Sequence, residues 1–147
     1  MIVRGIDRFG VALVLLAGLI LATDSHAETY VYTGAWSDHI ASKTDYNETH
    51  NLVAVEYKST IAGYFENSFG DDSFFAGSTY SRQWGDFEAG LMVGAMYGYK
   101  GCKGQQSEPK KTVCPMVAPT VSYTKYQAEP SFIILGNAVA LSVRWEL

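Results

Sequence analysis

The C-terminal end of the chain alternates between apolar and polar residues. Its apolar residues fall on every second position, at Val139, Leu141, Val143, Trp145 and Leu147, and the residues between them are Ala140, Ser142, Arg144 and Glu146. Because successive side chains of a β-strand point to opposite faces, this pattern predicts a strand with one apolar and one polar face. The chain therefore ends on a strand that must cover its apolar face with either a protein core or lipid.

Stretches of the same kind recur along the chain and are separated by turn residues. We predict strands at Tyr30–Trp36, Asn51–Tyr57, Thr60–Asn67, Ser73–Ser81, Phe87–Lys100, Val113–Tyr126, Ser131–Gly136 and Ala138–Leu147. No second domain and no internal repeat is visible. The pattern predicts an all-β protein with eight antiparallel strands.

The stretch at 87–100 has the clearest pair of faces. One face is apolar and aromatic, and the other carries Gly90, Gly94 and a third glycine together with two methionines. Glycine within a strand marks either a close approach or free space, and methionine adapts to apolar guests. This face predicts a cavity for a hydrocarbon chain, with Gly90 and Gly94 as binding residues. In the alternative interpretation, larger inward residues such as Tyr64 or Arg144 fill that space.

Two architectures fit eight such strands. A soluble barrel of the lipocalin type would turn its apolar faces inward, whereas an outer-membrane barrel turns them toward lipid and must close completely. Long connections at 37–50 and 101–112 alternate with tight turns, which is typical of outer-membrane barrels. The terminal strand also resembles the assembly signal of bacterial outer-membrane proteins. We therefore favour a transmembrane β-barrel.

The N-terminal residues point to export. Two arginines precede an apolar run at 11–22, and small residues at Ser25 and Ala27 fit a signal-peptidase site. We expect a signal peptide at residues 1–27 and an outer-membrane barrel at residues 28–147. In an oxidising compartment, Cys102 and Cys114 predict one disulfide.

Charge and location together limit the partners. The net charge of −4 does not favour nucleic acid as a partner. In the bacterial outer membrane, the expected partners are phospholipid, lipid A and the outer-membrane assembly machinery. We expect a monomer that needs no cofactor and no metal.

Three prolines interrupt the last strands. Pro115 and Pro119 lie within the sixth predicted strand, and Pro130 precedes the seventh. Proline cannot donate a hydrogen bond to a neighbouring strand, and unpaired backbone groups are costly in lipid. Two adjacent strands weakened in this way predict a lateral opening in the barrel wall. In a milder interpretation, Pro115 lies above the membrane and Pro119 at a bulge.

Residues suited to proton chemistry gather in two connections that face the same end of the predicted barrel. The first holds His39 and His50, and the third holds Asp72 and Ser73. A histidine that a carboxylate orients can act as a general base toward a hydroxyl group. Polar loops facing water also contain such residues without any catalysis.

Three stretches carry a resemblance to a known family: 43–51 (KTDYNETHN), 69–80 (FGDDSFFAGSTY) and 114–123 (CPMVAPTVSY). With the terminal strand, they resemble the lipid A palmitoyltransferase family of outer-membrane barrels. The resemblance implies an eight-stranded barrel with an interior acyl pocket, which moves an acyl chain from phospholipid to lipid A. It implies the following site residues: Asp72 and Ser73 at the family's Asp-Ser pair, Tyr46 and Asn47 at its loop motif, and Pro119 at a gate proline.

The catalytic base is less clear. The family's histidine follows a tryptophan, but Ser37 follows Trp36 here, so the resemblance implies His39, with His50 as the alternative. Two other functions stay open. One is a barrel whose surface loops act in adhesion, membrane integrity or receptor blocking, without catalysis. The other is a soluble carrier of an apolar ligand.

Overall fold

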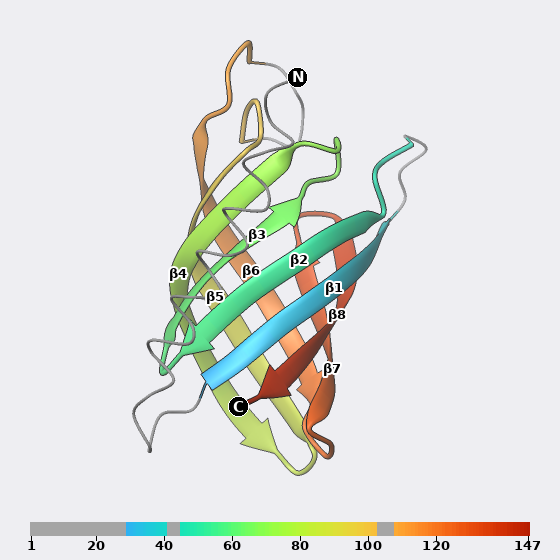
Figure 1. The fold of residues 1–147 in the computed structure, drawn as a ribbon, viewed down its shortest axis with the longest axis vertical. Coiled ribbons are helices and arrows are strands. Elements are labelled where there is room, and N and C mark those ends of the chain that lie inside the picture. Colours follow the sequence, from blue (N-terminus) through green and yellow to red (C-terminus); the bar gives the residue numbers. More distant parts are fainter. Residues whose placement is uncertain (1–28, 41–44, 103–107) are drawn as a thin grey trace.

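The chain folds into a closed barrel of eight antiparallel strands (Figure 1). The computed structural model describes residues 29–40, 45–102 and 108–147. Each strand pairs with its neighbours in sequence, and the last pairs with the first. The strands are β1 (Thr29–His39), β2 (Thr49–Tyr57), β3 (Thr60–Glu66), β4 (Asp72–Trp84), β5 (Phe87–Tyr97), β6 (Val113–Tyr123), β7 (Ala128–Leu135) and β8 (Ala138–Glu146).

The predicted fold class and the eight strands are confirmed, with shifts at the strand ends. The first strand continues to His39, so His39 belongs to a strand and not to a loop. The fifth strand ends at Tyr97, three residues earlier than predicted. Gly98 follows it with a φ of 143°, which breaks the extended backbone. The predicted signal peptide, residues 1–27, lies outside the described residues.

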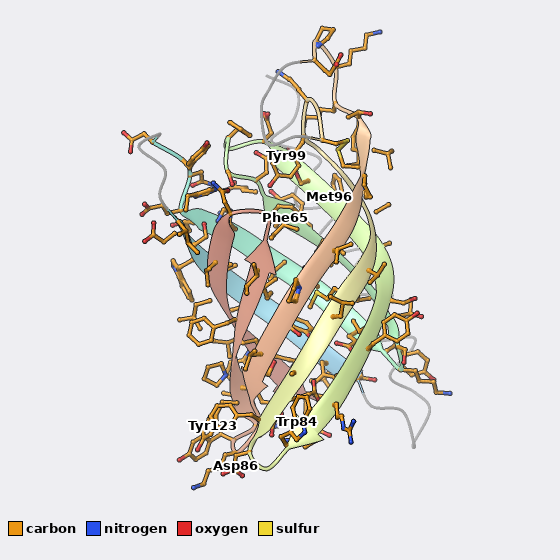
Figure 2. The ribbon with its side chains drawn as sticks, turned by 180° about the vertical axis from the view of Figure 1, so that it is seen from behind. Phe65, Trp84, Asp86, Met96, Tyr99 and Tyr123 are labelled. Carbon is orange, nitrogen blue, oxygen red and sulfur yellow. A yellow bond between two sulfur atoms is a disulfide. The ribbon has the colours of Figure 1, made fainter. Side chains whose placement is uncertain are left out.

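The two ends of the barrel differ. One end, which we call the turn end, carries the tight connections after Tyr57, Trp84 and Tyr123. The amide of Leu147 donates to the carbonyl of Thr29 there, so the first and last described residues meet. The opposite end, which we call the loop end, carries the long connections after β1, β3 and β5. Figure 2 shows Trp84 and Tyr123 at the turn end, and Phe65, Met96 and Tyr99 at the loop end.

The apolar faces of β4 to β8 point out of the barrel. The alternate residues Leu91 and Val93 on β5, and Phe132 and Ile134 on β7, expose at least a third of their surface. The residues between them point inward, and among these Met92 and Ser131 are buried. The orientation that sequence left open is therefore resolved: the exposed apolar face of these strands points outward, and the interior combines polar side chains toward the turn end with small and apolar ones toward the loop end.

Within the described part of the chain, no helix is long and apolar enough to cross a membrane.

A cluster of charged side chains fills the interior at the turn end. Arg144 of β8 forms ion pairs with Glu129 and, at 2.7 Å, with Glu88. Its guanidinium lies 4.2 Å from the ring centre of Tyr30. Charge-assisted hydrogen bonds of this kind are strong when buried. We call Arg144, Glu88, Glu129 and Tyr30 the charged plug.

A second group of hydrogen bonds continues the plug toward the middle of the barrel. The Tyr32 hydroxyl donates to one Glu56 oxygen at 2.8 Å, and the Thr79 hydroxyl donates to the other at 2.6 Å. The prediction that Arg144 fills the interior therefore holds for this half. Tyr64 does not fill it, since its ring lies beside Phe74, a residue of the outward face.

The predicted disulfide is present between Cys102 and Cys114, whose Cα atoms are 5.3 Å apart. Cys114 is the second residue of β6 and is almost fully buried, while Cys102 belongs to the connection after β5. The bond therefore ties this connection to the loop end of the barrel wall.

The charged plug makes a first prediction. Substitution Arg144→Ala removes the only cation paired with Glu88 and Glu129 among the described contacts, and leaves both carboxylates inside the barrel. We expect it to lower the free energy of unfolding by about 3–5 kcal/mol, measured by urea titration in detergent micelles. The matched control Arg82→Ala removes an exposed arginine and should change this free energy by less than about 0.5 kcal/mol. Equal effects of the two substitutions would contradict the structural role of the plug.

Candidate functional site

The loop-end half of the barrel encloses a cavity of about 320 Å³. This volume lies in the usual range of small-ligand sites, about 300–1,000 Å³. The walls are mainly apolar, and three methionines contribute to them, as expected for an adaptable apolar site. The apolar lining includes Leu52, Ala54, Ile61, Phe65, Phe75, Met92, Met96, Met116, Ala118, Ile133 and Leu135. Figure 2 shows Phe65, Met96 and Tyr99 near this end.

The cavity is closed toward the turn end. Tyr32 and Met92 border it and also border a small polar void next to Glu56 and Arg144. Both side chains are at least 95% buried. They form the floor of the cavity and separate it from the charged plug. A ligand in the cavity therefore meets an apolar floor and a polar mouth.

One Ser–His pair lies at the mouth between β1 and β2. The Ser37 Oγ and His50 Nε2 atoms are 2.5 Å apart, and both side chains are buried and border the cavity. The other ring nitrogen of His50, Nδ1, lies 2.6 Å from the carbonyl oxygen of Glu66. This histidine is therefore held from both sides.

A second Ser–His pair lies beside the first. His39 Nε2 is 3.0 Å from the Ser68 Oγ, and both residues border the cavity. The ring of Tyr46 stacks on His39, with the ring centres 4.0 Å apart, and contacts Phe69 edge-on. The cavity mouth thus carries two histidines and two serines from three different segments of the chain.

A bulge in β1 turns these residues toward the cavity. The pairing of β1 with both neighbours shifts between Thr33 and Trp36, and Gly34 and Ala35 have φ angles of 75° and 128°. Before the bulge, the even-numbered Tyr32 faces inward. After it, the odd-numbered Ala35 and Ser37 are buried, whereas Trp36 is 54% exposed. A bulge of this kind re-aims side chains, and here it directs Ser37 and His39 to the cavity.

The turn between β3 and β4 depends on Asn67, which is fully buried. Its amide nitrogen donates to the Ser73 Oγ and to the Gly98 carbonyl. Its side-chain oxygen accepts from the amides of Phe69 and Asp71. These bonds join Asn67 to residues on both sides of the turn that contains Ser68. Asn67 therefore fixes the backbone position of Ser68.

Asn47 connects the first long connection to the same turn. Its backbone amide donates to the carbonyl of Ser68 at 2.8 Å, and its side-chain amide donates to the carbonyl of Asn67. The adjacent Tyr46 is the residue that stacks on His39. The predicted binding residues Tyr46 and Asn47 therefore do lie at the site, Tyr46 in the cavity wall and Asn47 as a support.

The barrel wall is incompletely paired between β6 and β7. These strands share three residue pairs, Thr120 to Ser122 on β6, whereas β5 and β6 share eleven. The segment Val113–Pro119 is not paired with β7 and contains two prolines, which have no amide hydrogen to donate. We call this stretch the β6–β7 seam. The cavity lining includes Pro115 and Val117 on one side of the seam, and Ile133 and Leu135 on the other.

The lateral opening predicted from the prolines was placed between the same two strands as the seam. Pro119 occupies the last unpaired position of β6, next to the paired Thr120. Pro130 lies beyond the paired stretch, toward the turn end, and does not border the cavity. Of the three prolines, only Pro115 reaches the cavity.

The predicted pairing of His39 with Asp72 and Ser73 differs from the structure. The Asp72 carboxylate accepts from the Tyr64 hydroxyl at 2.7 Å, and Ser73 is fully buried against Asn67. Neither residue borders the cavity. The reason is that β4 begins at Asp72, so both residues belong to the barrel wall and not to the turn.

Gly90 and Gly94 also differ from their predicted role. Both lie on the inner face of β5, but neither borders the large cavity. A Cβ atom at Gly94 would come within 2.1 Å of the Ala76 carbonyl oxygen, and one at Gly90 within 2.6 Å of the Thr120 hydroxyl. These glycines therefore allow neighbouring strands to approach closely. The free space comes instead from the small Ala54 and Ala118.

Sequence reasoning missed Ser37, Ser68 and Asn67 as parts of the site. Ser37 was noted only as a departure from a family motif, and the Asn67-Ser68 pair precedes the Asp72-Ser73 pair in the same connection. The signal in the sequence was the run at 67–73, which is rich in turn-forming residues and contains both the Asn67-Ser68 and the Asp72-Ser73 pair. Sequence alone does not show which pair faces the cavity.

The electrostatics of the mouth favour a neutral His39. Burial lowers the pKa of His39 below its ordinary value of 6.5, and the repulsion that His39 and His50 would feel if both were protonated lowers it further. Asp38 and Glu48 act in the opposite direction but more weakly. A neutral imidazole can accept a proton, as a general base must. Among the described residues, no group of three or more metal-ligating side chains is placed to hold an ion.

The comparisons with known proteins identify no family for this chain. A scan of the sequence against protein-family models finds no match, and a search of curated proteins finds none either.

The buried amide of Asn67 makes a second prediction. Asn67→Ala removes its four hydrogen bonds, so we expect a loss of about 2 kcal/mol in the free energy of unfolding. The control is Gln83→Ala, which removes an exposed amide with two bonds and should cost less than about 0.5 kcal/mol. Urea titration of both variants measures the difference. A cost for Asn67→Ala no larger than the control would contradict its role in the turn.

A third prediction concerns the titration of His39. NMR titration of the imidazole protons should give a pKa below 6.5, and His50→Gln should raise it because two protonated imidazoles at the mouth would repel each other. Since the folded chain binds this proton less readily than the unfolded chain, His39 reduces stability as the pH falls through 6.5. A His39 pKa above 6.5, or one that His50→Gln leaves unchanged, would contradict the proposed electrostatics.

Proposed function

We propose that this protein is an outer-membrane enzyme that binds a lipid acyl chain in its cavity and transfers it from phospholipid to lipid A. One observation carries the proposal: an apolar cavity inside the barrel ends at a mouth that holds two Ser–His pairs. Serine and histidine within hydrogen-bonding distance are the groups that ester chemistry requires.

The outer surface supports the membrane location. Apolar side chains of β4 to β8 face outward, which in water would leave a large apolar surface uncovered. Exposed aromatic residues lie at both ends: Trp84 and Phe87 at the turn end, and Trp36 and Tyr97 toward the loop end. Apolar bands with aromatic residues at their edges are typical of outer-membrane barrels.

The shape of the cavity supports an acyl chain as the ligand. The floor at Tyr32 and Met92 is closed, so a chain enters with its methyl end first and keeps its polar end at the mouth. This orientation places an ester group beside Ser37, His39, His50 and Ser68. A fatty acyl chain buries apolar surface there at about 25 cal/mol per Å², which supplies the binding free energy.

The β6–β7 seam supports entry of the chain from the membrane. Its unpaired segment reaches the cavity at Pro115 and Val117, and these residues lie on a strand whose outward residues face the proposed lipid phase. Opening the seam breaks no ladder hydrogen bonds between β6 and β7 along Val113–Pro119. A phospholipid chain can therefore pass sideways into the barrel without leaving an apolar environment.

The resemblance to the lipid A palmitoyltransferase family supports lipid A as the acceptor. The cavity end and the loops after β1 and β3 meet at Tyr46 and Asn47, the residues that match the family's loop motif. By this proposal the loop end faces the outside of the cell, where lipid A is found. The acyl donor is a phospholipid of the same membrane.

The fourth prediction tests the cavity. Ala118→Phe places a large ring in the middle of the cavity, where the native side chain is 2% exposed. Lipid A from cells that express the protein should carry one additional acyl chain in its mass spectrum, and this species should fall at least about 10-fold with Ala118→Phe. The control Ala95→Phe adds the same ring to the outward face of β5 and should leave the acylated species unchanged.

Two results would contradict the proposed function. One is unmodified lipid A with the native protein confirmed in the outer membrane. The other is a product that Ala118→Phe leaves unchanged although the variant is folded, because the acyl chain would then not occupy the cavity. The first result would favour a barrel that acts through its surface loops.

A further inference from the structure

The two Ser–His pairs at the cavity mouth are not equivalent. Ser37 and His50 are both more than 90% buried, and their atoms are 2.5 Å apart. Ser68 is only partly buried, and its Oγ lies 3.0 Å from His39 Nε2. The Ser37–His50 pair is therefore both the shorter and the more buried of the two.

The backbone fixes which nitrogen of His50 carries the proton. The Nδ1 atom lies 2.6 Å from the carbonyl oxygen of Glu66, which can only accept a hydrogen bond. Nδ1 must therefore carry a hydrogen and donate it. In the neutral ring this leaves Nε2 without a hydrogen, so Nε2 accepts the proton of the Ser37 hydroxyl.

This arrangement has the three parts of an activated serine. Ser37 is the hydroxyl nucleophile, His50 is a base within hydrogen-bonding distance, and a third group orients the base from behind. A backbone carbonyl takes the place that a carboxylate occupies in many hydrolases. The bulge at Gly34 and Ala35 turns Ser37 into the cavity, where an ester would lie.

We infer that Ser37 is a covalent nucleophile, activated by His50, and that the acyl chain passes through an ester with the Ser37 hydroxyl. The inference rests on the proposed function and adds to it a named intermediate. The family that the sequence resembles has histidine at the position after the tryptophan, so this serine is a property of this chain.

The reaction balances without any further reactant. The Ser37 Oγ forms a bond to the carbonyl carbon of the phospholipid ester while its proton moves to His50 Nε2. The bond from that carbon to the glycerol oxygen breaks, and His50 gives the proton to the departing oxygen, which leaves as a lysophospholipid. A lipid A hydroxyl then attacks the acyl-serine, loses its proton to His50, and restores the Ser37 hydroxyl.

The same geometry explains the position of the second pair. A hydroxyl acceptor must approach the acyl-serine from the loop end, where His39 and Tyr46 form the edge of the mouth. His39 is partly exposed there, and its lowered pKa keeps the ring neutral. The His39 ring is thus placed to orient the acceptor, while Ser37 holds the acyl group.

The test uses the purified native protein in detergent micelles and a long-chain alkyl fluorophosphonate as the probe. This probe forms a stable bond from phosphorus to an activated serine oxygen and releases fluoride. We expect one adduct on the peptide that contains Ser37, found by mass spectrometry. The adduct should be absent in Ser37→Ala and form at least about 100-fold more slowly in His50→Gln, because the base is lost.

The matched control is Ser131→Ala. Ser131 is a fully buried serine of β7 whose hydroxyl lies 2.7 Å from the Ser122 hydroxyl, and it does not border the cavity. This variant should label Ser37 at the native rate. Heat-dependent migration in gel electrophoresis shows that each variant is folded. Release of lysophospholipid from phospholipid micelles is measured beside the labelling and should fall at least about 100-fold in Ser37→Ala.

Each outcome separates this inference from the proposed function. Lysophospholipid release that persists within about 10-fold in folded Ser37→Ala, or an adduct on Ser68, would overturn Ser37 as the nucleophile and leave the proposed function standing. Release by the native protein with no adduct would do the same. An adduct on Ser37 without release from phospholipid would support the nucleophile and overturn the proposed donor. Neither adduct nor release would overturn both.

Discussion

The ion pairs of Arg144 inside the barrel are the interaction on which the rest of the structure depends. The interior of an eight-stranded barrel is just wide enough for side chains or for one small ligand, and here Arg144 with Glu88 and Glu129 fills the turn-end half of it. The polar cost of burying these groups is offset because each carboxylate meets the same guanidinium. Tyr32 and Met92 lie on this cluster, so the other half becomes a cavity with a closed floor. The charged plug thus supports the floor that closes the cavity.

The polar side chains of the candidate site lie where three irregular features of the fold meet. The bulge of β1, the buried Asn67 turn and the first long connection each deliver one or two of the polar side chains. None of these features belongs to the regularly paired parts of the strands. The regular pairing therefore closes the barrel without involving the residues of the site. The disulfide between Cys102 and Cys114 lines the same end and ties the loop after β5 to the wall beside the seam.

Sequence predicted the regular part of this structure well and the irregular part poorly. Alternation of side chains gave all eight strands, because strand faces follow a period of two wherever the ladder is regular. The same rule failed at Ser37, since a bulge at Gly34 and Ala35 reverses the faces and leaves no proline or turn motif to announce it. The Ser37–His50 contact joins two strands across a 13-residue separation, and only the pairing register brings them together. Asp72 and Ser73 were assigned to the site because they match the Asp-Ser pair of the family that the sequence resembles, and they lie instead in the barrel wall at the start of β4.

The bulge in β1 also divides that strand into two parts whose inward-facing positions follow different numbering. Up to Thr33 the inward positions are the even ones, and Tyr32 there is tied to the plug. Beyond Ala35 the inward positions are the odd ones, which hold the mouth. The bulge sets two residues, Gly34 and Ala35, opposite the single residue Ser142 of β8, so a deletion of one of them would leave Ser37 facing the cavity and Tyr32 facing the plug. The mouth and the plug can thus keep their side chains through a deletion at this one point, which spares the residues that keep the barrel closed.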